Sequence, residues 1–156
     1  MKSKLVIKTS VFQGTQKEIF EKLQKLQTLQ YIAYPYATFE AVDGATDLIW
    51  EEGKVFLFKF RLFGVIPFGI HTIRVERFDE ERGIYTLEGN QHVPVWNHEI
   101  VLATLDENKV QYTDKIEIAA GWKTPFVCLW ARMFYSHRQR KWKKLLSKRN
   151  RNVRFK

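Results

Sequence analysis

The 156-residue sequence predicts an α+β fold in which one curved antiparallel sheet wraps around a long C-terminal helix. Three observations lead to this expectation. Polar and apolar residues alternate at the start of the chain, aromatic and β-branched segments without helical periodicity fill residues 36–120, and a helical stripe follows Gly121. A chain of this length is expected to form one domain that buries about 70% of the surface of the unfolded chain.

The first strand is predicted over residues 4–11, where apolar side chains alternate with polar ones. Thr15 and Glu18 then have the spacing of a capping box, which marks the start of a helix. Apolar residues continue at helical spacing to about Gln30, as one helix or as two short ones. Pro35 disfavours helical backbone at the residue before it, so the helical segment is expected to end there.

Seven segments rich in aromatic and β-branched residues follow, at 36–43, 46–52, 54–63, 69–78, 84–91, 95–105 and 110–119. Short turn sequences containing Gly, Pro, Asp or Asn separate them. Parallel pairing would need crossover helices between the strands, and there is no room for these. The sequence therefore predicts an antiparallel meander of six or seven strands between the helical segment and the long helix.

The long helix is predicted from about Pro125, which suits a first helical turn, to residue 148 or 149. Residues 150–156 then form a short basic end. One face of the helix carries a stripe at helical spacing, made of Val127, Trp130, Ala131, Phe134, Arg138, Lys141, Trp142 and Leu145. Cys128 lies on the same helix, and we expect it to be a small buried apolar residue rather than a reactive thiol.

The net charge of +9 is confined to one end of the chain. Residues 137–156 contain ten Lys and Arg and no acidic residue, whereas residues 1–136 have a net charge of −1. The body is therefore neutral and the tail is basic. A single cysteine excludes a disulfide framework within the chain and a cysteine-rich metal site. No apolar run is long enough to span a membrane and no signal sequence precedes the first strand, so we expect a cytoplasmic protein.

The strands 95–105 and 110–119 place two ionisable residues on the apolar face of the sheet. A turn at 106–108 puts His98 opposite Ile116 and Ile100 opposite Asp114, so His98 and Asp114 become diagonal neighbours. Such a pair is costly to bury unless it is hydrogen-bonded. Three interpretations stay open: the pair fixes the register of the sheet, it lines a cavity and orients a polar group of a ligand, or it acts as a general acid and base.

The remaining inward face is aromatic and is interrupted by polar residues, which is typical of a small-molecule pocket rather than a dry core. The residues expected to line such a cavity are Phe56, Phe58, Phe60, His71, Trp96, His98, Tyr112, Asp114, Trp130 and Phe134. There is no glycine-rich phosphate loop, no metal-ligand spacing and no nucleophile elbow. The sequence therefore predicts no catalytic residue, no metal and no cofactor.

Several short motifs resemble those of the START-related helix-grip (SRPBCC) superfamily, which includes polyketide cyclase/dehydrase-like, lipid-transport-like and pollen-allergen-like proteins. They are Trp-Asn-His at 96–98, Tyr-Thr-Asp at 112–114, Gly-Trp-x-x-Pro at 121–125 and the Phe-x-x-x-Arg region at 133–138. The resemblance implies a seven-stranded sheet gripping the C-terminal helix, with residues 1–149 forming a START-like ligand-binding domain. It also implies a hydrophobic cavity and binding of lipids, polyketides or sterols. Pro94 lacks the glycine that stands beside it in many members, which implies a different rim.

Three functions follow from these features. The first, which we favour, is a non-enzymatic carrier or sensor of a hydrophobic small molecule such as a lipid or a polyketide-like compound. The second is a cyclase, dehydratase or hydrolase that uses His98 and Asp114. The third is docking on an anionic surface through the basic C-terminal helix and tail, for which we expect a membrane rather than nucleic acid. The sequence predicts no oligomeric state.

Overall fold

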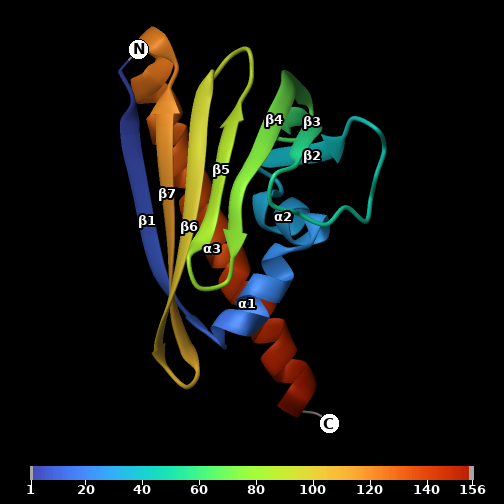
Figure 1. Cartoon of the computed structure of the whole chain (residues 1–156), viewed down its shortest axis with the longest axis vertical. Coiled ribbons are helices and arrows are strands. Elements are labelled where there is room, and N and C mark those ends of the chain that lie inside the picture. Colours follow the sequence, from blue (N-terminus) through green and yellow to red (C-terminus); the bar gives the residue numbers. More distant parts are fainter. Residues whose placement is uncertain (1, 155–156) are drawn as a thin grey trace.

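Seven antiparallel strands form one curved sheet, and a long helix packs across its inner side (Figure 1). The computed structural model describes residues 2–154, with side chains described for residues 2–148. The strands are β1 (Lys4–Gln13), β2 (Ala37–Ala41), β3 (Val55–Leu62), β4 (Ile66–Asp79), β5 (Gly83–Gly89), β6 (Val95–Asp106) and β7 (Lys109–Ala119). The helices are α1 (Gln16–Leu23), α2 (Leu26–Ala33), the short 3-10 helix η1 (Gly121–Lys123) and α3 (Thr124–Arg154).

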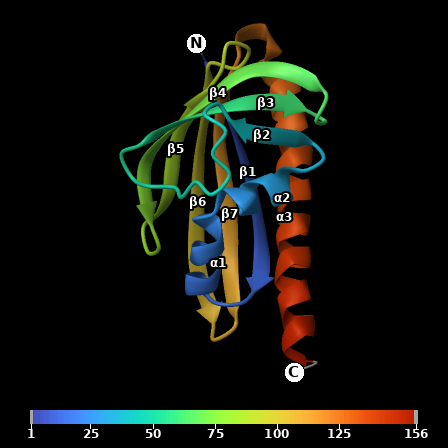
Figure 2. The same cartoon turned by 90° about the vertical axis from the view of Figure 1, so that its right-hand side faces the viewer.

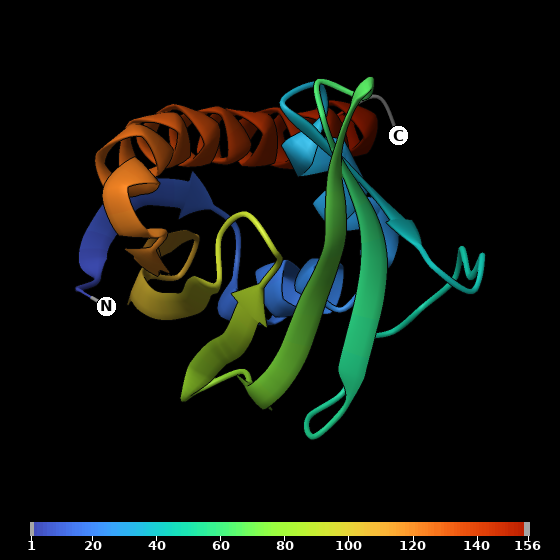
Figure 3. The same ribbon diagram turned by 90° about the horizontal axis from the view of Figure 1, so that it is seen from above.

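The strand order is β1-β7-β6-β5-β4-β3-β2, so β2 to β7 form a meander and β1 returns to pair with β7. This confirms the predicted fold class of a seven-stranded antiparallel sheet with a C-terminal helix. Helix α3 runs along the sheet and contacts β1, β7 and α2 (Figure 2). Seen from above, the sheet curves around an interior that α3 closes on one side, with α1 and α2 inside the curve (Figure 3).

The predicted strand at 46–52 is wrong. This segment belongs to the loop between β2 and β3, and its one sheet-like contact is an isolated bridge between Lys25 and Ile49. Its backbone bonds the junction of α1 and α2 instead: Leu26 N donates to Leu48 O, and Trp50 N donates to Gln24 O. Leu48 and Trp50 turn inward and pack on the core. The segment therefore has the alternation of inward and outward side chains that is typical of a strand, although it pairs with no strand among the described residues.

The helical segment after β1 begins as predicted and forms two short helices, which is one of the two predicted alternatives. Thr15 caps α1, with its hydroxyl accepting the Glu18 N–H at 3.2 Å. The helix ends at Leu23, and α2 begins three residues later and continues to Ala33. The backbone becomes extended at Tyr34, before Pro35, as the proline requires.

The pairing of β6 with β7 follows the predicted register through most of its length. His98 is opposite Ile116 and Ile100 is opposite Asp114. Near the turn the register shifts, because an irregularity after Thr104 places Asp106 rather than Leu105 opposite Lys109. The even-numbered residues of both strands point inward from Trp96 to Leu102 and from Val110 to Ile118, so the predicted buried face is confirmed.

Helix α3 packs with the predicted face toward the sheet, and Cys128 is buried there as a free thiol. The helix continues to Arg154, beyond the predicted end at residue 148 or 149. The side chains of the predicted basic end at 150–156 lie outside the described residues, and residues 155–156 also lie outside the described backbone. Among the described residues, no helix combines the length and hydropathy that crossing a membrane requires.

Candidate ligand-binding cavity

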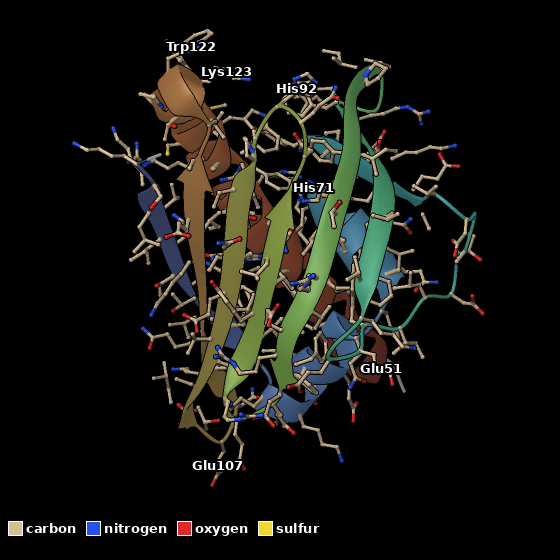
Figure 4. The ribbon with its side chains drawn as sticks, turned by 45° about the horizontal axis from the view of Figure 1, so that its top comes forward. Glu51, His71, His92, Glu107, Trp122 and Lys123 are labelled. Carbon is tan, nitrogen blue, oxygen red and sulfur yellow. The ribbon has the colours of Figure 1, made fainter. Side chains whose placement is uncertain are left out.

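A cavity of about 550 Å³ lies between the inner face of the sheet and helices α2 and α3. Its walls are mostly aromatic and aliphatic side chains from β2 to β6, from α2 and from the first half of α3. Trp122 and Phe126 line it and are 80% and 69% exposed, so the cavity meets the surface near the start of α3. Figure 4 shows Trp122 and Lys123 at this end of the molecule. The volume is in the range that holds a small organic molecule.

Six of the ten residues predicted to line a cavity lie in its wall: Phe60, His71, Trp96, His98, Trp130 and Phe134. They come from the neighbouring strands β3 and β4, from β6 and from α3, so three separate parts of the sequence converge there. Trp130 stacks on Phe134 with ring centroids 4.6 Å apart, which forms an aromatic surface on the helix side.

Phe56, Phe58, Tyr112 and Asp114 do not line the cavity. Phe56 packs edge-on against Trp50 at 4.9 Å, and Phe58 is entirely buried among the core side chains. Tyr112 belongs to a second buried cluster with Trp142, further along α3. The cavity occupies only the part of the inner face near the first half of α3, and strand alternation identifies a face without saying which part of it is hollow.

Asp114 lies behind His98 and has no contact with solvent. Its Oδ1 bonds His98 Nε2 at 2.6 Å, and its Oδ2 accepts from Gln139 Nε2 at 2.9 Å. Gln139 also donates to the Lys8 carbonyl and accepts from the Ser10 hydroxyl, so the chain of bonds reaches β1. Both carboxylate oxygens are therefore occupied, and His98 alone presents the pair to the cavity.

Glu88 is a second buried carboxylate at the wall, and it is not among the ten residues predicted to line the cavity. Its side chain is 10% exposed and bonds His71 Nε2 at 2.8 Å and the Thr86 hydroxyl. Burial raises the pKa of the Glu88 carboxyl. The hydrogen bond from His71 and the charges of His71 and His98 have a larger opposite effect, so the pKa of Glu88 lies below its ordinary value. The signal for Glu88 is the alternation of β5, which turns Ile84, Thr86 and Glu88 to one face.

Arg138 is the largest departure from the predicted charge distribution. Composition assigns it to the basic tail, but it is 6% exposed and lines the cavity. Burial lowers the pKa of its guanidinium, and the opposing effect of Tyr135, Asp114 and other acidic groups raises it above its ordinary value, so the group stays charged. The sequence feature that predicts its inward orientation is its place on the helical stripe of α3, which faces the sheet.

Tyr135 joins the helix to the sheet beside these groups. Its hydroxyl accepts the Trp96 indole N–H at 3.0 Å, and its ring lies 5.1 Å from the His98 ring. Burial raises the pKa of the Tyr135 phenol, so it remains protonated at neutral pH. In the described part of the chain no three His, Cys, Asp or Glu side chains gather to hold a metal ion. The wall thus combines apolar surface with a few oriented polar groups.

Solved structures with the same architecture cover nearly the whole chain. The protein Ms6760 from Mycobacterium smegmatis superposes with a TM-score of 0.71 at 13% identity, covering 94% of this chain and 96% of that one. A START superfamily protein from the same organism has a TM-score of 0.64 at 13% identity, with 92% and 97% covered. The Zhui aromatase/cyclase from Streptomyces sp. R1128 has a TM-score of 0.65 at 16% identity, with 97% and 96% covered.

These similarities show that the chain has the START-like helix-grip fold, as its sequence motifs predict. No curated protein matches the sequence. Residues 10–146 match a family described as a domain of unknown function, DUF8410, and this match runs from the end of β1 through β7 to most of α3. The chain therefore belongs to the DUF8410 family and has a START-like fold.

Proposed function

We propose that the chain binds a hydrophobic small molecule in the cavity between the sheet and α3, as a carrier or sensor rather than as an enzyme. The observation that carries this proposal is the cavity of about 550 Å³, with apolar walls and charged residues placed among them. A protein core of this size normally packs without such a void. Apolar pockets with a few convergent polar groups are the usual form of small-molecule sites.

The binding energy would come mainly from apolar surface. Removing apolar ligand surface from water contributes about 25 cal/mol per Å², so roughly 400 Å² gives about 10 kcal/mol before the costs of association are subtracted. The aromatic pair Trp130 and Phe134 and the side chains of β3 and β4 supply this surface. The buried polar groups would then orient the ligand and select its chemistry.

The enzyme hypothesis that uses His98 and Asp114 is less well supported. Asp114 is closed off from the cavity and both of its oxygens are occupied, so it is placed to hold His98 rather than to exchange protons with a ligand. His98 itself faces the cavity. Its side-chain hydrogen bond is to Asp114 and not to a hydroxyl or thiol that could act as a nucleophile. A binding protein requires only that the His98 ring be held in this orientation toward the ligand.

Docking through the basic tail is a separate proposal, and it concerns the far end of α3. A helix of 31 residues is roughly 45 Å long, so the basic segment lies far from Trp122 and the cavity mouth. Described cations there already contact tyrosines: Lys141 Nζ lies 4.2 Å from the centroid of the Tyr31 ring. Co-sedimentation with vesicles containing phosphatidylserine, with and without residues 149–156, tests whether the tail binds membranes.

Titration with N-phenyl-1-naphthylamine, a neutral apolar fluorophore, tests the cavity proposal. The full chain is expected to bind it saturably with a blue-shifted emission. Val127→Trp, in the wall, should weaken binding at least tenfold by filling the cavity. Leu129→Trp adds the same side chain at an exposed position of the same helix and should not change binding. Equal binding by both variants, or no saturable binding by the unmodified chain, would contradict the proposal.

A further inference from the structure

Arg138 is a buried cation whose guanidinium has no hydrogen-bonding or ionic partner among the described residues. Its side chain is 6% exposed, and in the described part of the chain its guanidinium forms neither a hydrogen bond nor an ion pair within 4.0 Å. Its Nε is shielded from solvent and has no acceptor among the side chains that the structure describes. The contacts it makes are with aromatic faces, since Cζ lies 5.5 Å from the Phe134 ring centroid and 4.9 Å from that of Tyr135.

The nearby carboxylates do not neutralise it directly. Asp114 is bonded to His98 and Gln139, and Glu88 is bonded to His71 and Thr86. Each carboxylate therefore already has close donors of its own. A guanidinium in an apolar environment without a close counter-charge is strongly destabilising. Such a group is rarely retained in a cavity wall unless something else pairs with it.

Among the described polar groups of the cavity wall, hydrogen-bond donors are left unpaired while the acceptors are occupied. Besides Arg138 Nε, the indole N–H of Trp130 is buried in the same wall and has no acceptor within the described part of the chain. The acceptors of the wall are in use, because the Glu88 carboxylate takes bonds from His71 and Thr86 and the Tyr135 hydroxyl takes one from Trp96. A ligand that completes this wall must bring acceptor oxygens rather than donors.

From this arrangement we infer that the cavity binds an apolar molecule that ends in a carboxylate, and that Arg138 binds that carboxylate. A guanidinium presents parallel N–H groups that match the two oxygens of a carboxylate, and such charge-assisted pairs are roughly twice as strong as neutral hydrogen bonds. The aromatic and aliphatic walls would hold the apolar part. This inference rests on the proposed function, because it names the chemical class of the ligand in the same cavity.

The test compares decanoate with 1-decanol, which share an apolar chain and differ at the polar end. Each displaces N-phenyl-1-naphthylamine from the full chain at pH 7.5, and the displacement curves give their dissociation constants. The unmodified chain is expected to bind decanoate about tenfold more tightly than decanol. Arg138→Met should abolish this preference, with each dissociation constant calculated from the variant's own directly measured affinity for the fluorophore. Arg132→Met removes the same charge at an exposed position of α3 and should keep the preference.

The outcomes separate this inference from the proposed function. Absence of fluorophore binding to the unmodified chain would overturn both. Fluorophore binding together with equal affinities for decanoate and decanol, or a preference that survives in Arg138→Met, would overturn the carboxylate site and leave the cavity proposal standing. If Arg138→Met does not fold, Arg138→Lys decides the role of the guanidinium. It retains the charge without the parallel donors and should reduce the preference severalfold, so an unchanged preference would count against the site.

Discussion

His98 and Asp114 are joined diagonally across β6 and β7 by a hydrogen bond of 2.6 Å, although the residue directly opposite Asp114 is Ile100. Asp114 also accepts from Gln139 on α3 at 2.9 Å. One carboxylate thus connects two strands with the long helix. Its structural effect is to hold the His98 ring at the cavity wall and to set the position of α3 against the sheet.

Replacing this carboxylate is expected to destabilise the fold. Asp114→Asn puts an amide donor where Gln139 also donates, and it should lower the free energy of unfolding by about 1–3 kcal/mol. Urea unfolding followed by far-UV circular dichroism measures the change. Glu107→Gln, an exposed change in the turn between β6 and β7 (Figure 4), is the control and should stay within about 0.5 kcal/mol. An Asp114→Asn variant as stable as the unmodified chain would show that the bond does not connect helix and sheet.

Glu88 makes stability depend on acid pH. Its pKa in the folded chain lies below the ordinary value of 4.5, so as the pH falls the unfolded chain takes up the proton first. The stabilisation is complete above about pH 4.5 and is lost as the pH falls through the folded pKa. Urea midpoints measured from pH 7 to pH 3 should therefore fall more steeply for the unmodified chain than for Glu88→Gln. Parallel profiles for the two proteins would contradict this role.

Arg138→Met is expected to stabilise the ligand-free protein. The substitution removes a buried cation that lacks a close counter-charge and keeps a long side chain against Phe134 and Tyr135. A gain of about 1–3 kcal/mol in the free energy of unfolding follows from this exchange. Thermal unfolding without ligand measures it, with Arg132→Met as the surface control. A lower melting temperature would mean that the aromatic contacts already compensate the charge.

Trp50 lies in the loop between β2 and β3 and contributes this loop's side chain to the cavity wall. It lines the cavity and packs against Phe56 and Phe58, with ring centroids 4.9 and 5.6 Å away. Trp50→Ala should cost about 2–4 kcal/mol and weaken fluorophore binding. The adjacent Ile49 is 66% exposed, so Ile49→Ala should change neither quantity appreciably. Similar losses in the two variants would indicate that the loop as a whole, rather than Trp50, stabilises this wall.

Strand alternation predicts much of the fold because the two faces of the sheet differ strongly in polarity. The neighbours of His98 and Asp114 alternate between apolar and charged side chains, so only one register buries the apolar set. The same reasoning fails at 46–52. Leu48 and Trp50 alternate with exposed residues there, yet their backbone bonds the junction of two helices. The alternation of polar and apolar residues predicts which side chains turn inward, but it does not predict which segment the backbone pairs with.

The candidate site is predictable only in part for a related reason. Periodicity places Phe58 and Phe60 on the same inward face, but the distance between sheet and helix decides which of them meets a cavity. Glu88 follows from the alternation of β5 once that strand is given a buried face. Arg138 is one of ten basic residues at 137–156. Its place on the stripe of α3 predicts an inward side chain, but the packing of α3 against the sheet decides that it lines the cavity.

The most direct measurement is a crystal structure of the chain grown with decanoate. The alkyl chain is expected inside the cavity, between Trp130 on α3 and His71 on β4, with the carboxylate within hydrogen-bond distance of the Arg138 guanidinium. A cavity filled by rearranged side chains, or decanoate bound only at the protein surface, would contradict it.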